Sequence, residues 1–111
     1  MASDDRRLHD ILVASDELAS YLEGHDEDDF LEDRLRQRAV ERLLTIIGEA
    51  AKQLPDEVRQ AMPGVDWRKV CGFRDVLIHA YFGIDDDILW DVIANKLPGL
   101  EATVAAHLQQ P

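Results

Sequence analysis

The residues best suited to chemistry in this 111-residue chain are an arginine, a histidine and a tyrosine that lie close together, Arg74, His79 and Tyr81. Four residues separate the arginine from the histidine, and one residue separates the histidine from the tyrosine. An arginine has a permanent positive charge and a planar fork of donors that fits a phosphate group. A histidine titrates near neutral pH and can accept or release a proton. Together with a phenol, these groups could cleave a phosphodiester bond.

The sequence around this triplet resembles the signature of the HEPN superfamily and, within it, of the HepT-like ribonucleases, whose pattern is R-x4-H-x-Y. The R-x4-H spacing alone occurs by chance in many helices, but the longer string with its flanks is specific. The resemblance covers most of the chain, from the first expected helix to the last. The flanking matches are Gly48-Glu49-Ala50-Ala51, Val65-Asp66-Trp67, Phe82-Gly83-Ile84-Asp85, Trp90 and Leu97-Pro98-Gly99-Leu100.

The resemblance implies a metal-independent endoribonuclease that needs no cofactor. RNA carries its own nucleophile, the 2′-hydroxyl group beside the scissile phosphate. His79 would act as the general base or acid, and Arg74 would stabilise the charge that develops on the phosphoryl oxygens. Asp75 could orient His79 through a hydrogen bond, as carboxylates do for other catalytic imidazoles. Tyr81 could bind RNA by stacking or through a hydrogen bond.

The resemblance also implies a biological role and a protein partner. Proteins of this kind act as toxins in two-component toxin–antitoxin systems of a type VII-like class, in which a minimal nucleotidyltransferase is the antitoxin. The antitoxin can silence the toxin by transferring AMP to the tyrosine of the motif, which is Tyr81 here. An added nucleotide would place negative charge and bulk in the path of the RNA. The alternative is a non-catalytic helical binding module that scaffolds the nucleotidyltransferase and binds nucleotide or RNA.

The spacing of Arg74 and His79 leaves their arrangement open. On a helix with 3.6 residues per turn, positions five apart are separated by roughly 140°, whereas Asp75 and His79, four apart, share one face. The long stem of Arg74 could reach round the helix, the helix could distort near Gly83, or two chains could share the site. The resemblance favours the last arrangement, because such domains typically dimerise with both motifs facing one cleft. We therefore expect a homodimer.

The net charge of −11 argues against nucleic-acid binding when it is averaged over the chain, but its distribution does not. Residues 1–33 hold 12 acidic and 2 basic residues, residues 34–74 hold 5 and 9, and residues 75–111 hold 6 and 1. The balances are −10, +4 and −5, so positive charge is concentrated in the middle of the chain. Such a zone can bind phosphate in an acidic protein, although charge alone favours a solvated helix face of mixed charge.

Length and composition indicate one soluble domain that covers residues 1–111. An apolar content of 46% with 32% charged residues is typical of globular proteins. No stretch approaches the ~18 apolar residues of a membrane span, and we expect no signal peptide at the acidic N-terminus. With Cys71 as the only cysteine, the expected compartment is the cytoplasm.

Apolar residues recur at helical spacing and no strand pattern persists, which predicts an all-α, HEPN-like, up-and-down four-helix bundle with a short extra helix. We expect main helices over about residues 4–23, 28–54, 66–82 and 86–97. A short helix should follow Pro55, and a last helix should cover about residues 100–109 after a break at Pro98-Gly99. The second helix has a broad apolar stripe, which places it at the centre of the bundle or at a dimer contact.

The remaining candidate residues have structural interpretations. Glu49 falls in the apolar register of the second helix, where a buried carboxylate should pair with an arginine of the third helix. Cys71 should be a small packed residue, and no pattern of metal ligands is present around it. Surface positions are expected for three histidines, and core or interface positions for both tryptophans; these are His9, His25, His107, Trp67 and Trp90.

Overall fold

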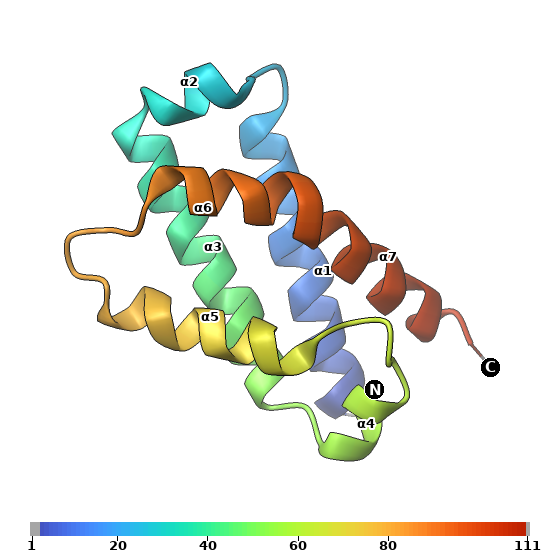
Figure 1. Cartoon of the computed structure of the whole chain (residues 1–111). Helices are drawn as coiled ribbons and strands as arrows, with labels where there is room; N and C mark the ends of the chain where they lie inside the picture. The colour runs from blue at the N-terminus through green and yellow to red at the C-terminus, as the bar shows by residue number, and fades with distance from the viewer. Residues whose placement is uncertain (1–2, 111) are drawn as a thin grey trace.

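The protein is a bundle of helices, described for residues 3–110 by a computed structural model (Figure 1). No strand occurs within these residues, so the all-α class expected from the sequence is confirmed. Over the same range, no helix is long and apolar enough to cross a membrane. In chain order the elements are α1 (Ser3–Leu22), α2 (Glu27–Leu31), α3 (Arg34–Lys52), α4 (Asp56–Gln60), α5 (Trp67–His79), α6 (Asp86–Asp91), the π-helical segment η1 (Val92–Lys96) and α7 (Leu97–Leu108).

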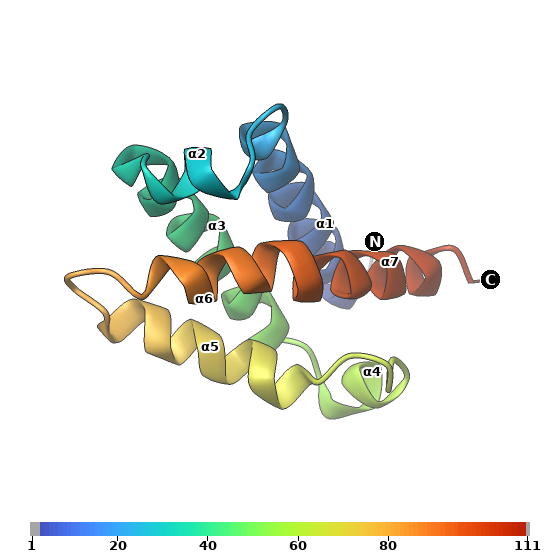
Figure 2. The same cartoon turned by 45° about the horizontal axis from the view of Figure 1, so that its top comes forward.

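The bundle is built on α1 and α3, which lie side by side and pack along most of their length (Figure 1). α5 packs against α3, and α7 packs against α1. In the turned view, α6, η1 and α7 form one continuous helical run that crosses the bundle (Figure 2). Since α3 has α1 and α5 as neighbours, its broad apolar stripe is explained by a central position in one chain.

The core draws side chains from almost every helix. Phe30, Val40 and Leu89 are fully buried, and each buried side chain of this size contributes ~1.5–3 kcal/mol to the hydrophobic stabilisation of the fold. The ring of Phe30 lies against the half-buried ring of Trp90, with their centroids 5.6 Å apart. Trp67 is buried at the start of α5, where its indole N–H donates to the carbonyl of Met62 at 3.1 Å. Both tryptophans are therefore packing residues.

Several helix ends lie where the sequence predicts them. The side chain of Asp66 accepts a hydrogen bond from the backbone N–H of Lys69 at 3.2 Å and caps α5. Asp85 caps α6 in the same way, through the backbone N–H of Asp87 at 2.9 Å. The short helix after Pro55 is α4. These caps fix where α5 and α6 begin, and α5 carries the candidate catalytic residues.

The single helix expected over about residues 28–54 is wrong, because it is two helices, α2 and α3. Asp33 separates them with an extended backbone (φ −115°, ψ 93°) and caps α3 by accepting from the N–H of Arg36 at 3.0 Å. That hydrogen bond lowers the pKa of the Asp33 carboxyl. The buried side chain of Gln37 donates to the Phe30 carbonyl at 2.9 Å and satisfies the end of α2. The apolar stripe continues through the break, so spacing alone cannot reveal it.

The break expected at Pro98-Gly99 is also wrong, since the chain stays helical from α6 to the end of α7 (Figure 2). The last helix expected over residues 100–109 is thus part of a longer one. In η1 the N–H of Leu97 donates to the carbonyl of Val92, five residues earlier. A proline ring normally clashes with the carbonyl four residues before it. The wider π turn accommodates the ring of Pro98, so the helix changes its hydrogen bonding and does not end.

The C-terminal end of α5 comes earlier than predicted. The helix expected to reach Tyr81 or Phe82 ends at His79, and Ala80 is its C-cap. Gly83 has a φ of +93°, which glycine adopts without strain, and its N–H donates to the Ala80 carbonyl at 2.9 Å. The turn removes Tyr81 and Phe82 from the helix and leaves them 83% and 96% exposed.

Candidate active site

The position of α5 depends on a glycine of α3. A methyl group at Gly48 would overlap the Cβ of Arg74 and lie 2.9 Å from its Cγ. Because Gly48 has no side chain, the stem of Arg74 lies directly against the backbone of α3. Position 48 in the Gly-Glu-Ala-Ala string therefore requires a glycine, because α3 and α5 approach each other closely where Arg74 packs.

The guanidinium group of Arg74 is held by two carboxylates. Its Nη2 lies 2.5 Å from Oε2 of Glu49, and its Nη1 donates to Oδ1 of Asp75 at 3.0 Å. The hydrogen bond to Asp75 raises the pKa of Arg74. The expected pairing of Glu49 with an arginine is confirmed, although the Glu49 side chain is 47% exposed and not buried. The Arg74 side chain keeps 21% of its surface open to solvent, so its charge is fixed in direction but still reachable.

The carboxylate of Asp75 has a second cationic partner, Lys52, the last residue of α3. Nζ of Lys52 donates to Oδ1 of Asp75 at 2.9 Å. This hydrogen bond, followed by the one from Arg74, lowers the pKa of the Asp75 carboxyl. With Glu49, the cluster holds two positive and two negative charges at the junction of α3 and α5. Lys52 was not identified from the sequence as part of this cluster. The one feature of the sequence that could have indicated it is the spacing from Glu49, since residues three apart lie on the same face of α3.

The imidazole of His79 is oriented by the backbone of Asp75. Nδ1 of His79 lies 2.8 Å from the carbonyl oxygen of Asp75, four residues earlier on α5. With a proton on Nδ1, that nitrogen donates to the carbonyl, and Nε2 keeps a free lone pair. The expectation that the carboxylate of Asp75 orients His79 is therefore wrong, because the contact is made by the backbone carbonyl of Asp75. Its carboxylate contacts Arg74, so one residue contacts both members of the predicted pair.

The loop after α5 presents Tyr81 to solvent. No hydrogen bond of its hydroxyl occurs with any residue between 3 and 110. The loop itself is tied to α3, because Glu41 accepts a hydrogen bond from the N–H of Ile84 at 3.2 Å. Arg38 ion-pairs with Glu41 at 2.9 Å and also reaches the Phe82 carbonyl at 3.5 Å. The phenol is therefore accessible on a loop whose base is anchored to the bundle.

These observations agree with a comparison against known protein families. A family described as Ribonuclease HepT-like matches residues 11–106. The chain belongs to the HepT-like ribonuclease family. Its class of activity is that of a ribonuclease, and the HEPN-type assignment made from the sequence is confirmed.

Three similar proteins illustrate how far the similarity extends. A protein of Caldanaerobacter subterraneus, described as a candidate RNase, is 41% identical over 93% of this chain and 92% of its own length. A similarly described protein of Methanocaldococcus jannaschii is 42% identical over 82% of this chain and 75% of its own. The probable ribonuclease HepT of Thermococcus cleftensis is 39% identical over 85% of this chain and 86% of its own. No solved structure matches at a significant level.

The other candidate residues of this HepT-like ribonuclease lie apart from the Arg74 site. His9 and His25 are exposed on and after α1, and His107 is half-buried on α7. Cys71 is half-buried against the core, and its Sγ lies 3.8 Å from Nη1 of Arg59. In the part of the chain that the structure describes, no three His, Cys, Asp or Glu side chains are grouped so as to hold a metal ion.

Proposed function

We propose that this HepT-like ribonuclease is a metal-independent endoribonuclease and the toxin of a cytoplasmic, type VII-like toxin–antitoxin system. The observation that carries the proposal is the double contact of Asp75, whose carboxylate meets Arg74 and whose carbonyl meets His79. This double contact supports a site in which Arg74 supplies a fixed positive charge and His79 transfers protons, with Asp75 between them. That pairing is what transfer of a phosphoryl group to a 2′-hydroxyl requires.

In the proposed reaction, Nε2 of His79 accepts the proton of the 2′-hydroxyl group. The 2′-oxygen then forms a bond to phosphorus, and the bond from phosphorus to the 5′-oxygen of the next nucleotide breaks. The leaving 5′-oxygen takes a proton from an imidazolium or from water, which leaves a cyclic phosphate on one product. Arg74 stabilises the charge on the two non-bridging oxygens, and its carboxylate partners keep the guanidinium fixed during the step.

The active form is proposed to be a homodimer. Arg74 lies on the side of α5 that faces α3, whereas His79 lies on the exposed side of α5. Within one chain, the two side chains therefore point in different directions from the helix. A cleft between two chains would place a histidine and an arginine of both motifs around one RNA strand. Large apolar side chains exposed near this side of the protein support a contact there; they are Leu35, Val76, Phe82 and Ile88.

The proposed antitoxin is a minimal nucleotidyltransferase that AMPylates Tyr81. Such a partner needs a phenol that it can reach, and Tyr81 is 83% exposed. It lies two residues after His79, so a bound AMP would add a negative phosphate next to the proposed RNA path and repel the substrate. The loop is anchored through Glu41, which supports a fixed position for the modified side chain.

The alternative function is a non-catalytic module that scaffolds the nucleotidyltransferase and binds nucleotide or RNA. Two observations favour it: the net charge of −11 and the neutralisation of Arg74 by two carboxylates. A binding module would keep its affinity for RNA without cutting it. The two functions are therefore separated by one measurement, the cleavage of RNA by the purified protein.

The decisive experiment compares the wild type with His79→Ala, Arg74→Ala and Arg74→Lys. Expression without the partner should arrest growth, and the purified wild type should cut RNA in the presence of a metal chelator. His79→Ala should lower the rate about 10²–10⁴-fold, since general acid–base groups contribute that much. Arg74→Lys keeps the charge but loses the planar fork, so it should be impaired nearly as much as Arg74→Ala.

The matched control is His9→Ala, which removes another exposed histidine, on α1. It should arrest growth and cut RNA like the wild type. Circular dichroism must show unchanged helix content in every variant. Full activity in purified His79→Ala would reject the catalytic assignment, and RNA binding without cleavage in the wild type would support the binding module.

A further inference from the structure

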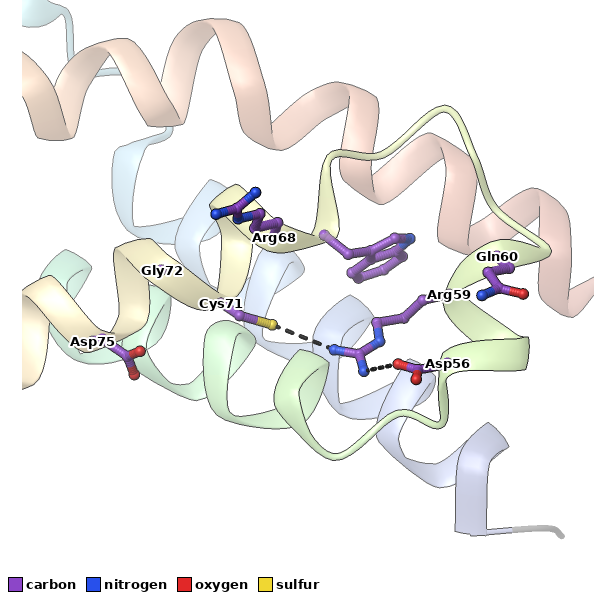
Figure 3. Close-up of a pocket in the computed structure, with 8 residues that line it drawn as sticks. Asp56, Arg59, Gln60, Arg68, Cys71, Gly72 and Asp75 are labelled. Carbon is purple, nitrogen blue, oxygen red and sulfur yellow. Dashed lines mark hydrogen bonds and ion pairs between the residues drawn. The ribbon is translucent and has the colours of Figure 1, made fainter.

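A shallow groove of about 670 Å³ lies between α4 and the first half of α5, next to the candidate active site (Figure 3). α4 contributes Arg59 to it, and α5 contributes Arg68, Cys71, Gly72 and Asp75. None of these groove residues belongs to the Arg74–His79–Tyr81 triplet. Asp75 stands at the end of the groove, and it is the residue that contacts both Arg74 and His79. The groove is thus continuous with the proposed cleavage site.

The exposed side of α5 leads from this groove to His79. Arg68, Gly72, Asp75 and His79 are spaced by four, three and four residues, so they lie along one face of the helix. A methyl group added at Gly72 would meet no atom within 4 Å, so the backbone is open to a ligand there. From Arg68 to His79 the face is about 16 Å long, since a helix rises ~1.5 Å per residue. That length exceeds one nucleotide and suits a strand that runs along the helix.

One charge in the groove is free to meet a phosphate-bearing ligand. The charged residues that line the groove are two arginines and two aspartates, so their charges balance, and both aspartates are held in ion pairs. Arg59 reaches from α4 toward Cys71 and is paired with Asp56 at 2.6 Å, so it ties the two walls together (Figure 3). Arg68 is exposed and makes no ion pair within residues 3–110. Its guanidinium is therefore available for a phosphate group.

We propose that this groove binds the single-stranded RNA beside the cleavage site, with Arg68 contacting a backbone phosphate and Gly72 giving the strand access to α5. The proposal rests on the proposed ribonuclease function and extends it to the path of the substrate. RNA is favoured over a protein ligand by the unpaired positive charge of Arg68 and by the continuity of the groove with Asp75. Arg68 acts in binding and does not take part in the reaction at phosphorus.

The first test measures binding of a fluorescein-labelled single-stranded RNA with 2′-O-methyl riboses, which cannot be cleaved through the 2′-hydroxyl. Arg68→Ala should weaken binding roughly tenfold at low salt, the loss expected for one charge-assisted hydrogen bond. The slope of log affinity against log salt should fall by about 0.7, the value for one phosphate contact of a single strand. Arg68 is exposed, so the variant should fold.

The matched control is Lys69→Ala, which makes the same charge change one residue further along α5. The Lys69 side chain is 86% exposed, pairs weakly with Asp66 at 3.9 Å and projects about 100° away from Arg68. Its removal should leave the affinity and the salt slope close to those of the wild type. An equal effect of both substitutions, or no effect of Arg68→Ala, overturns the proposal.

The second test uses cleavage. Arg68→Ala should raise KM for a long RNA at unchanged kcat, and it should cleave a dinucleotide as fast as the wild type, because a dinucleotide at His79 does not extend the ~16 Å to Arg68. If the wild type binds the methylated RNA through Arg68 but cuts no RNA, the ribonuclease mechanism is rejected and RNA binding in the groove is supported. If the wild type cuts RNA and Arg68→Ala binds it normally, only the proposal of RNA binding in the groove is rejected. Weaker binding of the nucleotidyltransferase, with RNA binding unchanged, would make the groove a protein-docking site and overturn the proposal.

Discussion

Nδ1 of His79 lies 2.8 Å from the backbone carbonyl oxygen of Asp75, within the last turn of α5. The orientation of the imidazole therefore depends on the helix itself and not on the side chain at position 75. The carboxylate of Asp75 instead accepts hydrogen bonds from Lys52 and Arg74. The same residue thus contacts His79, the proposed proton-transfer group, with its main chain and Arg74 with its side chain.

The first prediction separates these two contacts. Asp75→Asn leaves the carbonyl in place, so His79 should keep its orientation, while the ion pairs to Lys52 and Arg74 are lost. We expect ribonuclease activity to fall about tenfold or less, far less than the ~10²–10⁴-fold loss expected for His79→Ala. Steady-state cleavage of one RNA by both variants tests this. A loss in Asp75→Asn as large as in His79→Ala would show that the carboxylate itself orients the histidine.

The second prediction concerns the pH dependence of stability. Lys52 and Arg74 lower the pKa of Asp75 in the folded protein below the ordinary value of ~3.9. A lowered pKa means that the stabilisation is complete above the unfolded value and is lost as the pH falls through the folded value. Urea unfolding should therefore show a constant difference between the wild type and Asp75→Asn from neutral pH to about pH 5. The difference should shrink below about pH 4, and a decline that begins near neutral pH would contradict the assignment.

The third prediction concerns the contact between α3 and α5. Gly48→Ala forces a methyl group into the Cβ of Arg74, so it should destabilise the fold by ~1–3 kcal/mol or displace α5. Activity should fall with it, because Arg74 moves. Gly99→Ala is the matched control, since a methyl group there meets no atom within 4 Å. That variant should gain ~0.5–1 kcal/mol from its better helix propensity. Equal stability of the two variants in urea would show that α3 and α5 tolerate a wider separation.

Local signals in the sequence predicted the helix starts well. A side-chain cap acts within three residues, so Asp66 and Asp85 identify the beginnings of α5 and α6 without any knowledge of the fold. Asp33 is also a cap, but it follows an acidic run and interrupts an apolar stripe that continues on both sides. Pro98 was misleading for a different reason: the π turn of η1, which no short pattern indicates, accommodates its ring.

For the candidate site, the sequence predicted which residues contact each other better than it predicted which atoms make the contacts. The spacing of Asp75 and His79 predicted their contact, and the register of Glu49 predicted a pair with an arginine. The atoms involved were not predictable, because the carboxylate of Asp75 is taken by Lys52, which lies 23 residues away. Such long-range competition depends on how closely α3 and α5 approach each other, and that depends on Gly48.

The fourth prediction is that the protein is a homodimer. Most of the apolar stripe of α3 is buried within one chain, so the case rests on exposed apolar residues such as Leu35 and Phe82 and on the offset between Arg74 and His79. Light scattering should give the mass of two chains at micromolar concentration. Phe82→Glu should shift the equilibrium toward monomer, whereas Val13→Glu, at an exposed position of α1, should not. A wild-type monomer with full activity would contradict a shared site.

The last prediction concerns control at Tyr81. Co-expression with the cognate nucleotidyltransferase should yield a protein heavier by one or more AMP units, because the phenol is exposed and close to His79 in the chain. Tyr81→Phe should abolish the mass gain. Tyr21→Phe, which removes the other tyrosine, half-exposed on α1, should keep it. Tyr81→Phe should retain some cleavage, since a phenyl ring can still stack on a base, but should escape silencing by modification.

Two routes of inhibition must be separated in that experiment, because the proposed nucleotidyltransferase partner could also block the ribonuclease by tight binding. Binding leaves the covalent mass unchanged, so intact-mass measurement after denaturation reports modification alone. If Tyr81→Phe is still inhibited while its mass is unmodified, binding accounts for the inhibition. If the wild type keeps its unmodified mass beside a nucleotidyltransferase shown to be active on another substrate, transfer of AMP to Tyr81 is wrong for this protein.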